Sequence, residues 1–307
     1  MSEVDSEVER FSIVDGCGLS SRLLPLFVDY KGKMRGVGTA FLISPQLAIT
    51  AKHVVSQIFR KLEGKVMPGE ESNPFGFAMP GQRNTAVNVD FQLFAIQQTP
   101  DLQDNMVLLV MEEFISPNSD LVILRLARLL DGEVIQGMPI MELNPPAVGE
   151  KVEAFGYFDH RVVQRRNRGK QSSIEWRYRL ARSLGTVSQV FPEKGCGISK
   201  FPCFTSDMIL KDGMSGGPVF NSRGRICGVS SSALNAGGGE FIATSALLWP
   251  SMSIRIPEES LHVDLKPKIQ RVHDLAKSLM IAVVDWQRTI FDGDDMYFLA
   301  HMQNLEP

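Results

Sequence analysis

Hydrophobic residues between about Leu23 and Leu248 are arranged in short runs, which glycine, proline and asparagine turns separate from one another. Short runs rich in Val, Ile, Leu and Phe are typical of β-strands. The pattern predicts strands over Leu24–Tyr30, Gly38–Ile43, Leu47–Thr50, Asn88–Gln97, Leu121–Leu126, Lys151–Gly156, Gly185–Val190, Pro218–Phe220 and Arg225–Ser230. Many short strands at this spacing indicate a sandwich or a barrel rather than alternating strands and helices.

The spacing of apolar residues changes near the C-terminus. There they recur at steps of three and four, which is typical of one face of an α-helix. The residues of this stripe are Ile269, Val272, Leu275, Leu279, Val283, Trp286 and Ile290. Pro267 stands just before them, where a first helical turn tolerates proline. We therefore predict a C-terminal helix that packs on the preceding domain; the alternative is that its apolar face binds a partner or mediates self-association.

Two stretches have the composition of insertions. Residues Pro68–Asn84 are rich in glycine, proline and asparagine, as in a long surface loop. Residues His160–Arg182 hold eight Lys or Arg residues against one acid, Glu175. We interpret this basic stretch as a solvated, mobile loop. The alternative is a regulatory loop that responds to an acidic partner or to nucleic acid.

Composition and charge narrow the function classes. Hydrophobic residues make up 44% and charged residues 22% of the chain, and the net charge is −3. This balance gives no reason to expect nucleic acid or a membrane surface as the main partner. No run approaches the roughly 20 apolar residues that cross a bilayer. The acidic N-terminal residues lack the layout of a secretory signal, so we expect a cytoplasmic protein.

The four cysteines are Cys17, Cys196, Cys203 and Cys227. They form no CxxC pair, and no histidine stands at zinc-ligand spacing from them. We therefore expect reduced, mostly buried thiols and no metal site. A Cys196–Cys203 disulfide is the alternative in an oxidising compartment.

The strongest local signal is the turn Gly213-Met214-Ser215-Gly216-Gly217. Acyl transfer needs an exposed hydroxyl beside backbone N–H groups that stabilise a developing oxyanion. Glycines permit the tight turn that points such N–H groups inward. Ser215 is therefore a candidate nucleophile, and Gly213, Met214 and Ser215 form a candidate oxyanion hole. Glycine-rich turns with serine are common, so this turn needs a partner elsewhere in the chain.

A histidine supplies that partner. The predicted hairpin Gly38–Ile43 and Leu47–Thr50 leads directly into Ala51-Lys52-His53. Serine is a poor nucleophile unless an adjacent imidazole accepts its proton. A lone histidine at a strand end is usually structural, but the hairpin and the serine turn together carry what a joint site requires. We predict His53 as the general base.

An aspartate completes the predicted constellation. Asp120 heads the apolar run Leu121–Leu126, where a carboxylate is costly unless a hydrogen-bonding partner meets it. Pairing with His53 would fix the tautomer of the ring and stabilise the imidazolium that forms during attack. The alternatives are that Asp120 is an exposed turn residue, or that Asp90 takes this role.

The order His53, Asp120, Ser215 and the three neighbourhoods resemble the trypsin-like serine peptidases, in particular the HtrA-like branch without disulfides. The resemblance covers roughly Leu23 to Leu248 and extends to Val148–Tyr157, Gly185–Ser188 and Thr205–Val229. It implies a mostly β fold of two six-stranded antiparallel, chymotrypsin-like β-barrels with the active site between them. With the predicted C-terminal α-helical extension, the chain divides into an N-terminal segment (1–20), a peptidase domain (21–250) and the extension (251–307).

The resemblance also implies the activity, a serine endopeptidase that cleaves proteins or peptides through an acyl-enzyme and needs no cofactor. It implies that Ile209 lies near the floor of the specificity pocket and that Val229, Ser230 and Ser231 bind the substrate backbone. Ile209 is not an acid, so we expect small or medium apolar side chains before the cut rather than Arg or Lys. Met214 stands where extracellular members carry an aspartate for zymogen activation, and no PDZ-like domain follows.

Two other readings of the sequence compete with this one. An α/β-hydrolase esterase also carries a Gly-x-Ser-x-Gly turn, but it needs strand–turn–helix context and a later aspartate and histidine. Here a β-run follows Ser215, and His262, His273 and His301 fall in or near the predicted helical tail. The second alternative is a catalytically latent relative that only binds peptides or regulates a partner.

Overall fold

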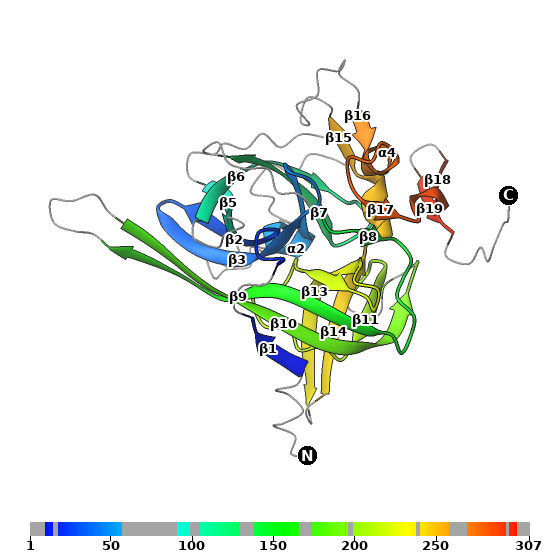
Figure 1. Ribbon diagram of the computed structural model, residues 1–307, viewed down its shortest axis with the longest axis horizontal. Helices are drawn as coiled ribbons and strands as arrows, with labels where there is room; N and C mark the ends of the chain where they lie inside the picture. Colours follow the sequence, from blue (N-terminus) through cyan, green and yellow to red (C-terminus); the bar gives the residue numbers. More distant parts are fainter. Residues whose placement is uncertain are drawn as a thin grey trace, which may run out of the picture.

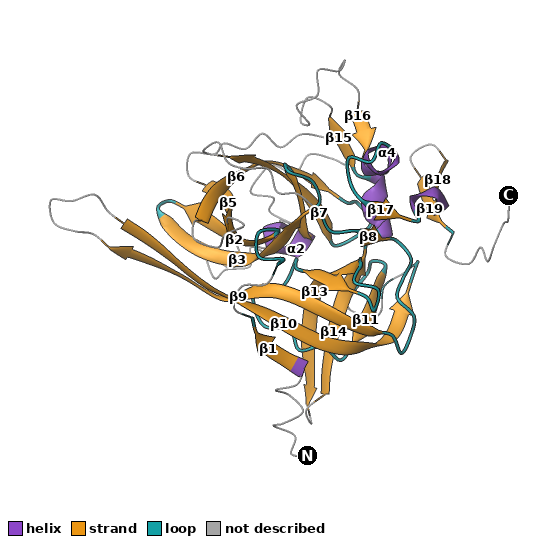
Figure 2. Ribbon diagram, viewed as in Figure 1, coloured by secondary structure: helices purple, strands orange, loops and turns teal. Residues whose placement is uncertain are grey.

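The computed structural model describes residues 10–14, 18–56, 91–98, 105–128, 138–165, 173–193, 195, 199–237, 240–257, 269–292 and 295–299. Two closed, six-stranded antiparallel barrels make up most of this part of the chain and lie side by side (Figures 1 and 2). The prediction of a mostly β, two-barrel fold is therefore confirmed. The predicted loop Pro68–Asn84 and the first residues of the predicted strand Asn88–Gln97 lie outside the described residues.

The first barrel runs in the order β2-β3-β4-β7-β6-β5 and closes on itself. Its strands are β2 (Leu23–Tyr30), β3 (Lys33–Leu42), β4 (Leu47–Ala51), β5 (Phe91–Gln98), β6 (Asn105–Ile115) and β7 (Leu121–Arg128). A tight hairpin joins β3 to β4, with Phe41 opposite Ile49, and β4 pairs in turn with β7. All five residues of β4 are buried, so this strand is held by pairing on both sides and by apolar packing.

The second barrel closes through a short strand. Its members are β9 (Lys151–Arg165), β10 (Ser173–Phe191), β11 (Cys203–Ser206), β12 (Pro218–Phe220), β13 (Ile226–Gly237) and β14 (Glu240–Leu247). The order is β12-β9-β10-β11-β14-β13, and β12 also pairs with β13, which completes the ring. Three short strands extend this sheet: β1 (Phe11–Ile13), β8 (Met141–Glu142) and β17 (Val283–Val284).

The basic stretch at residues 160–182 is largely β-structure, so its interpretation as a loop is wrong for the described residues. Strands β9 and β10 continue beyond the barrel as a two-stranded ribbon, with Ser173 opposite Arg165, and this ribbon projects from the molecule in Figure 1. Aromatic side chains account for the difference. Trp176 packs edge-on against Phe27 of the first barrel, with ring centroids 4.9 Å apart, and thereby ties the ribbon to β2.

The predicted C-terminal α-helical extension is wrong. The chain there forms η1 (Trp249–Ser253), β15 (Arg255–Pro257), β16 (Ile269–Arg271), α4 (Val272–Lys277), β17, η3 (Trp286–Arg288), β18 (Thr289–Asp292) and β19 (Asp295–Phe298). Helix α4 ends because Leu279 adopts a left-handed conformation (φ 61°) and Met280 donates a backbone hydrogen bond to Leu275. This arrangement is a Schellman-type helix end. Pro267 lies outside the described residues.

Tertiary pairing explains why the apolar stripe does not make a longer helix. Val283 pairs with Met141 of β8, so the chain is extended where the stripe predicts helix. The stripe is also not one buried face, because Leu275 is buried whereas Leu279 is 86% exposed. Leu275 and Ile281 belong to the same buried apolar cluster as the first barrel. The extension therefore packs within the chain through its short elements.

No helix in the described part of the chain is long and apolar enough to span a membrane. Cys203 and Cys227 are both buried, as predicted. Cys17 and Cys196 lie outside the described residues. Burial raises the pKa of the Cys227 thiol, which therefore stays protonated and unreactive at neutral pH.

Candidate active site

His53 and Asp120 meet because they stand at adjacent ends of two paired strands. Strand β4 pairs with β7, with Ala51 opposite Leu121, so the residue before β7 lies next to the residues that follow β4. The chain turns there into the short helix α2 (Lys52–Ser56), and the backbone N–H of Lys52 donates to the Asp120 carbonyl at 3.1 Å. The sequence-predicted His–Asp pair is thus built by the register of the first barrel.

Three hydrogen bonds satisfy the buried Asp120 carboxylate, which belongs to a residue only 7% exposed. The His53 ring nitrogen Nδ1 lies 2.7 Å from Asp120 Oδ2, and the His53 backbone N–H donates to Oδ1 at 2.9 Å. The hydroxyl of Ser231 donates to Oδ2 at 2.6 Å. These donors offset the cost of removing a carboxylate from water. Asp90, the fallback candidate, lies outside the described residues.

Ser215 lies in a turn whose glycines are required by geometry. Gly213 and Gly216 have φ values of 98° and 88°, a region that other residues rarely adopt. A Cβ at Gly216 would collide with the Thr39 carbonyl oxygen and the Thr50 hydroxyl. The Ser215 carbonyl accepts a hydrogen bond from the Thr39 N–H at 2.9 Å. The first barrel therefore presses directly against the serine turn of the second.

The Ser215 hydroxyl donates to the carbonyl oxygen of Ser231 at 2.8 Å. Among the residues that the structure describes, no hydrogen bond joins it to His53. Ser231 thus links the two halves of the site, because its hydroxyl holds Asp120 while its carbonyl holds Ser215. The structure brings His53 and Asp120 into direct contact and brings Ser215 to them through Ser231.

The turn leaves two backbone N–H groups unused. Within the described residues, neither the Gly213 nor the Ser215 N–H donates to another group. The Gly213 carbonyl does not occupy the space in front of these N–H groups, since it accepts a hydrogen bond from Thr39 Oγ1 at 2.8 Å. Met214 differs: its side chain is buried and its N–H donates to Lys211 at 3.0 Å. Of the three candidates for the oxyanion hole, Met214 uses its N–H group within the turn. The N–H groups of Gly213 and Ser215 are available to bind an oxyanion.

The predicted substrate-binding residues are mostly buried. The side chain of Val229 is in the core, and the Ser230 hydroxyl donates to the Met214 carbonyl at 2.8 Å. Ile209 is also buried, and its N–H donates to the Ser183 hydroxyl. The exposed part of β13 begins at Ser232.

A break in strand pairing explains the double role of Ser231. The register between β13 and β14 shifts between Ser230 and Ser232, which leaves Ser231 outside the regular pairing. Its hydroxyl and carbonyl are therefore available to Asp120 and Ser215. The sequence motif around Ser231 identifies the segment but not this shift.

Two further residues shape the site. The Thr39 hydroxyl accepts the Tyr157 N–H at 2.8 Å while it donates to Gly213, so it joins the two barrels. The ring of His160 lies behind the serine turn, because a Cβ at Gly213 would come within 2.8 Å of its Cε1 and Nδ1 atoms. Thr39 lies in the hairpin that leads to His53, whereas nothing in the sequence indicates the role of His160.

The described residues contain no group of three or more His, Cys, Asp or Glu side chains that could hold a metal ion. The groups that meet at this site are the Ser215 hydroxyl, the His53 imidazole, the Asp120 carboxylate and backbone N–H groups. This set suits nucleophilic acyl transfer, in which the imidazole moves a proton and the N–H groups bind an oxyanion.

Comparison with family sequence models identifies the family of this chain. The sequence model of a family described as "Trypsin-like peptidase domain" matches residues 38–229. No curated protein matches the sequence. Among solved structures, the Rv3671c protease from M. tuberculosis in its active form is similar, with 15% identity and a TM-score of 0.42 over 76% of this chain and 78% of that one.

Two other structures give similar values. The MamO protease domain from Magnetospirillum magneticum has 16% identity and a TM-score of 0.42, over 75% of this chain and 93% of that one. Deg5 has 13% identity and a TM-score of 0.41, over 75% of this chain and 85% of that one.

Proposed function

Because this chain belongs to the trypsin-like peptidase family, we propose that it is a serine endopeptidase with Ser215 as nucleophile, His53 as general base and Asp120 as the residue that orients His53. The observation that carries the proposal is the 2.7 Å contact between His53 Nδ1 and Asp120 Oδ2, with Ser231 joining Asp120 to Ser215. A carboxylate on Nδ1 holds the proton there and leaves Nε2 free to accept another.

In the first step a substrate carbonyl enters the site. The Ser215 hydroxyl then exchanges its hydrogen bond to the Ser231 carbonyl for a hydrogen bond to Nε2 of His53. Ser215 Oγ then attacks the carbonyl carbon while Nε2 takes its proton, and Asp120 stabilises the imidazolium. The negative oxygen of the tetrahedral intermediate accepts hydrogen bonds from the Gly213 and Ser215 N–H groups. The glycine conformations and Thr39 hold these donors in place before the substrate binds.

In the second step the carbon–nitrogen bond breaks and His53 gives its proton to the leaving amine. Water then attacks the acyl-enzyme, His53 accepts a proton from it, and the same N–H groups bind the second oxyanion. Collapse returns the proton to Ser215 and releases the carboxylic acid. No cofactor or metal enters the cycle.

We propose that side chains of small or medium apolar type precede the cut, because Ile209 offers no acid to pair with Arg or Lys. Since Val229 and Ser230 are buried, the exposed part of β13 from Ser232 onward is the segment we expect to bind the substrate backbone. A cleavage profile from a peptide library tests this, and dominance of Arg or Lys before the cut would contradict it.

One observation favours a second candidate function, a latent relative that binds peptides without cleaving them. The Ser215 hydroxyl is hydrogen-bonded to Ser231 rather than to His53. If that orientation persisted with substrate bound, the hydroxyl would keep its proton and the site would serve only for binding. Regulation through a partner, self-association of the C-terminal extension and a cytoplasmic location stay predictions.

A fluorophosphonate probe separates the two functions, because it labels only a serine that an adjacent base activates. We expect labelling of the wild type at Ser215, none in Ser215→Ala, and at least about a thousandfold less peptide cleavage in Ser215→Ala and in His53→Ala. Cleavage by Ser215→Ala at the wild-type rate would refute the assignment. Peptide binding without labelling or cleavage would identify the latent relative.

A further inference from the structure

The ribbon formed by β9 and β10 carries three arginines on one face. Arg161 and Arg177 are direct cross-strand partners, so their side chains lie on the same face of the ribbon. Arg179 follows Arg177 at the two-residue spacing that returns a side chain to the same face of a strand. The opposite face is apolar: Trp176 packs against Phe27 of the first barrel. The ribbon therefore has a packed inner face and a basic outer face.

Direct opposition of two arginines is unfavourable unless neighbouring groups compensate for it. Arg161 and Arg177 each have an acidic partner at 2.9 Å, which is Asp159 for Arg161 and Glu175 for Arg177. Arg179 makes no ion pair with any residue that the structure describes. The face thus holds three guanidinium groups against two carboxylates, and it retains a positive charge that a ligand can neutralise.

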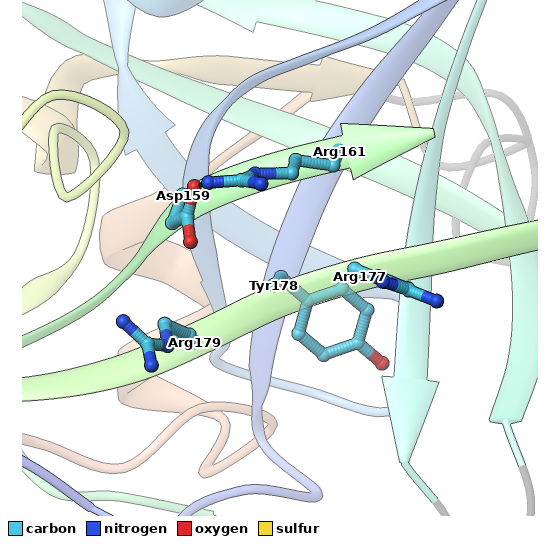
Figure 3. A pocket seen from close by; sticks show the side chains of 5 residues that line it. All are labelled: Asp159, Arg161, Arg177, Tyr178 and Arg179. Carbon is cyan, nitrogen blue, oxygen red and sulfur yellow. Dashed lines mark hydrogen bonds and ion pairs between the residues drawn. The ribbon is translucent and has the colours of Figure 1, made fainter. Parts of the chain in front are cut away.

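These side chains surround a hollow in the surface. It has a volume of about 320 Å³ and is lined by Asp159, Arg161, Arg177, Tyr178 and Arg179. Figure 3 shows Asp159 and Arg161 on one strand and the other three residues on its partner. Strand pairing shifts here, between Arg177 and Arg179, and Asp159 has a left-handed conformation (φ 53°). This irregularity separates the arginine side chains and opens the hollow.

We propose that this hollow binds an acidic polypeptide segment, whose carboxylates pair with Arg161, Arg177 and Arg179. Guanidinium forks bind carboxylates through paired hydrogen bonds. The two-residue spacing of Arg177 and Arg179 matches the spacing of side chains on one face of an extended peptide.

The location of the hollow places its ligand close to the candidate active site. His160 lies between Asp159 and Arg161 in the chain, and its ring packs behind Gly213 of the serine turn. The hollow is therefore connected to the serine turn through His160. The proposal concerns binding alone, so it is tested separately from peptide cleavage.

The test measures binding of a fluorescent peptide of alternating glutamate and serine to the Ser215→Ala protein, which cannot cleave it. We expect saturable binding that weakens as the salt concentration rises from about 50 mM to about 300 mM. A peptide of alternating glutamine and serine should not bind. The double substitution Arg161→Gln and Arg179→Gln should raise the Kd at least about tenfold.

Two further variants distinguish a binding role from a structural one. Lys151→Gln removes a positive charge at the far end of the same strand and should leave the Kd unchanged. Asp159→Asn keeps the side-chain shape, suits a left-handed conformation and removes a repelling carboxylate, so the peptide should bind more tightly. Thermal unfolding of each variant checks that the ribbon stays folded.

Three results would overturn the proposal. The first is binding of the acidic peptide that is equal in the double variant and in Lys151→Gln. The second is weaker binding in Asp159→Asn than in the parent protein. The third is binding of single-stranded oligothymidylate, but not of the acidic peptide, through the same arginines.

Discussion

Glu113 makes the stability of the first barrel depend on pH. It lies on β6 opposite Leu124 of β7, is buried, and has no hydrogen-bond partner for either carboxylate oxygen among the described residues. Burial raises the pKa of Glu113 from 4.5 to about 8. The folded protein therefore favours the protonated acid, whereas the unfolded chain ionises near the ordinary value.

The sign and size of the effect follow from this difference. The contribution of Glu113 to stability is greatest below pH 4.5 and is lost as the pH rises through 8, because ionisation of this group favours the unfolded chain throughout that window. At about 1.4 kcal/mol for each pH unit, the free energy of unfolding should drop by about 4 kcal/mol between about pH 5 and about pH 8.5. The substitution Glu113→Gln should remove this contribution, since a glutamine does not ionise.

Urea denaturation across that pH range, followed by tryptophan fluorescence, provides the measurement. Glu112→Gln is the matched control, because Glu112 is the next residue and its carboxylate pairs with Arg125 at 2.5 Å. This control should destabilise the protein at neutral pH and keep the wild-type slope with pH. A wild-type stability that stays level or rises over the window, or an equal slope in Glu113→Gln, would refute the reasoning.

Three more predictions use matched pairs of substitutions. Gly216→Ala should reduce cleavage at least about a hundredfold by displacing the serine turn, whereas Gly224→Ala, also at positive φ but in open space, should cost only about 1 kcal/mol of stability; equal activities of the two variants contradict this. Ser231→Ala should lower kcat by about 10- to 100-fold through loss of a charge-assisted hydrogen bond to Asp120, whereas Ser231→Thr keeps a hydroxyl and should retain most of the wild-type kcat; an unchanged kcat in Ser231→Ala would exclude a role of this hydroxyl in catalysis. Leu275→Ala in helix α4 should cost about 2–5 kcal/mol in urea denaturation, whereas the exposed Leu279→Ala should cost almost nothing; similar losses from both would favour a continuous helical face.

The parts of the fold that the sequence predicts correctly are those that local pattern controls. The hairpin that leads to His53 and the strand after Asp120 are continuous apolar runs, and both are buried in the first barrel. The turn around Ser215 is recognisable because its glycines adopt conformations that few other residues tolerate. That His53, Asp120 and Ser215 come together depends on tertiary structure. The family resemblance predicts this, whereas the spacing of the residues along the chain does not.

The sequence carries a strand signal for the ribbon of β9 and β10 that the loop interpretation overlooks. Trp176, Tyr178 and Leu180 alternate with Glu175, Arg177 and Arg179, which is the two-residue period of a half-buried strand. The density of positive charge in the same stretch favours a loop instead. The apolar partners that bury the alternate residues, Phe27 among them, lie far away in the sequence.

The C-terminal extension and Ser231 mark the limits of sequence reasoning. Steps of three and four predict a helix only if the backbone continues without reversal, and the left-handed residues Leu279 and Asp285 prevent this. Leu279 carries no turn signal of its own, and a lone aspartate such as Asp285 is too common in helices to mark a reversal. The role of Ser231 depends on a register shift between two strands, which no local pattern encodes.

The Thr39 hydroxyl limits which substitutions the contact between the two barrels can accept. It belongs to the first barrel, yet it accepts the Tyr157 N–H and donates to the Gly213 carbonyl, both in the second. A valine at this position would fill the same space, but the Tyr157 N–H and the Gly213 carbonyl would each lose this hydrogen bond between the barrels. Substitutions at this position of the first barrel are therefore constrained by the backbone of the second barrel.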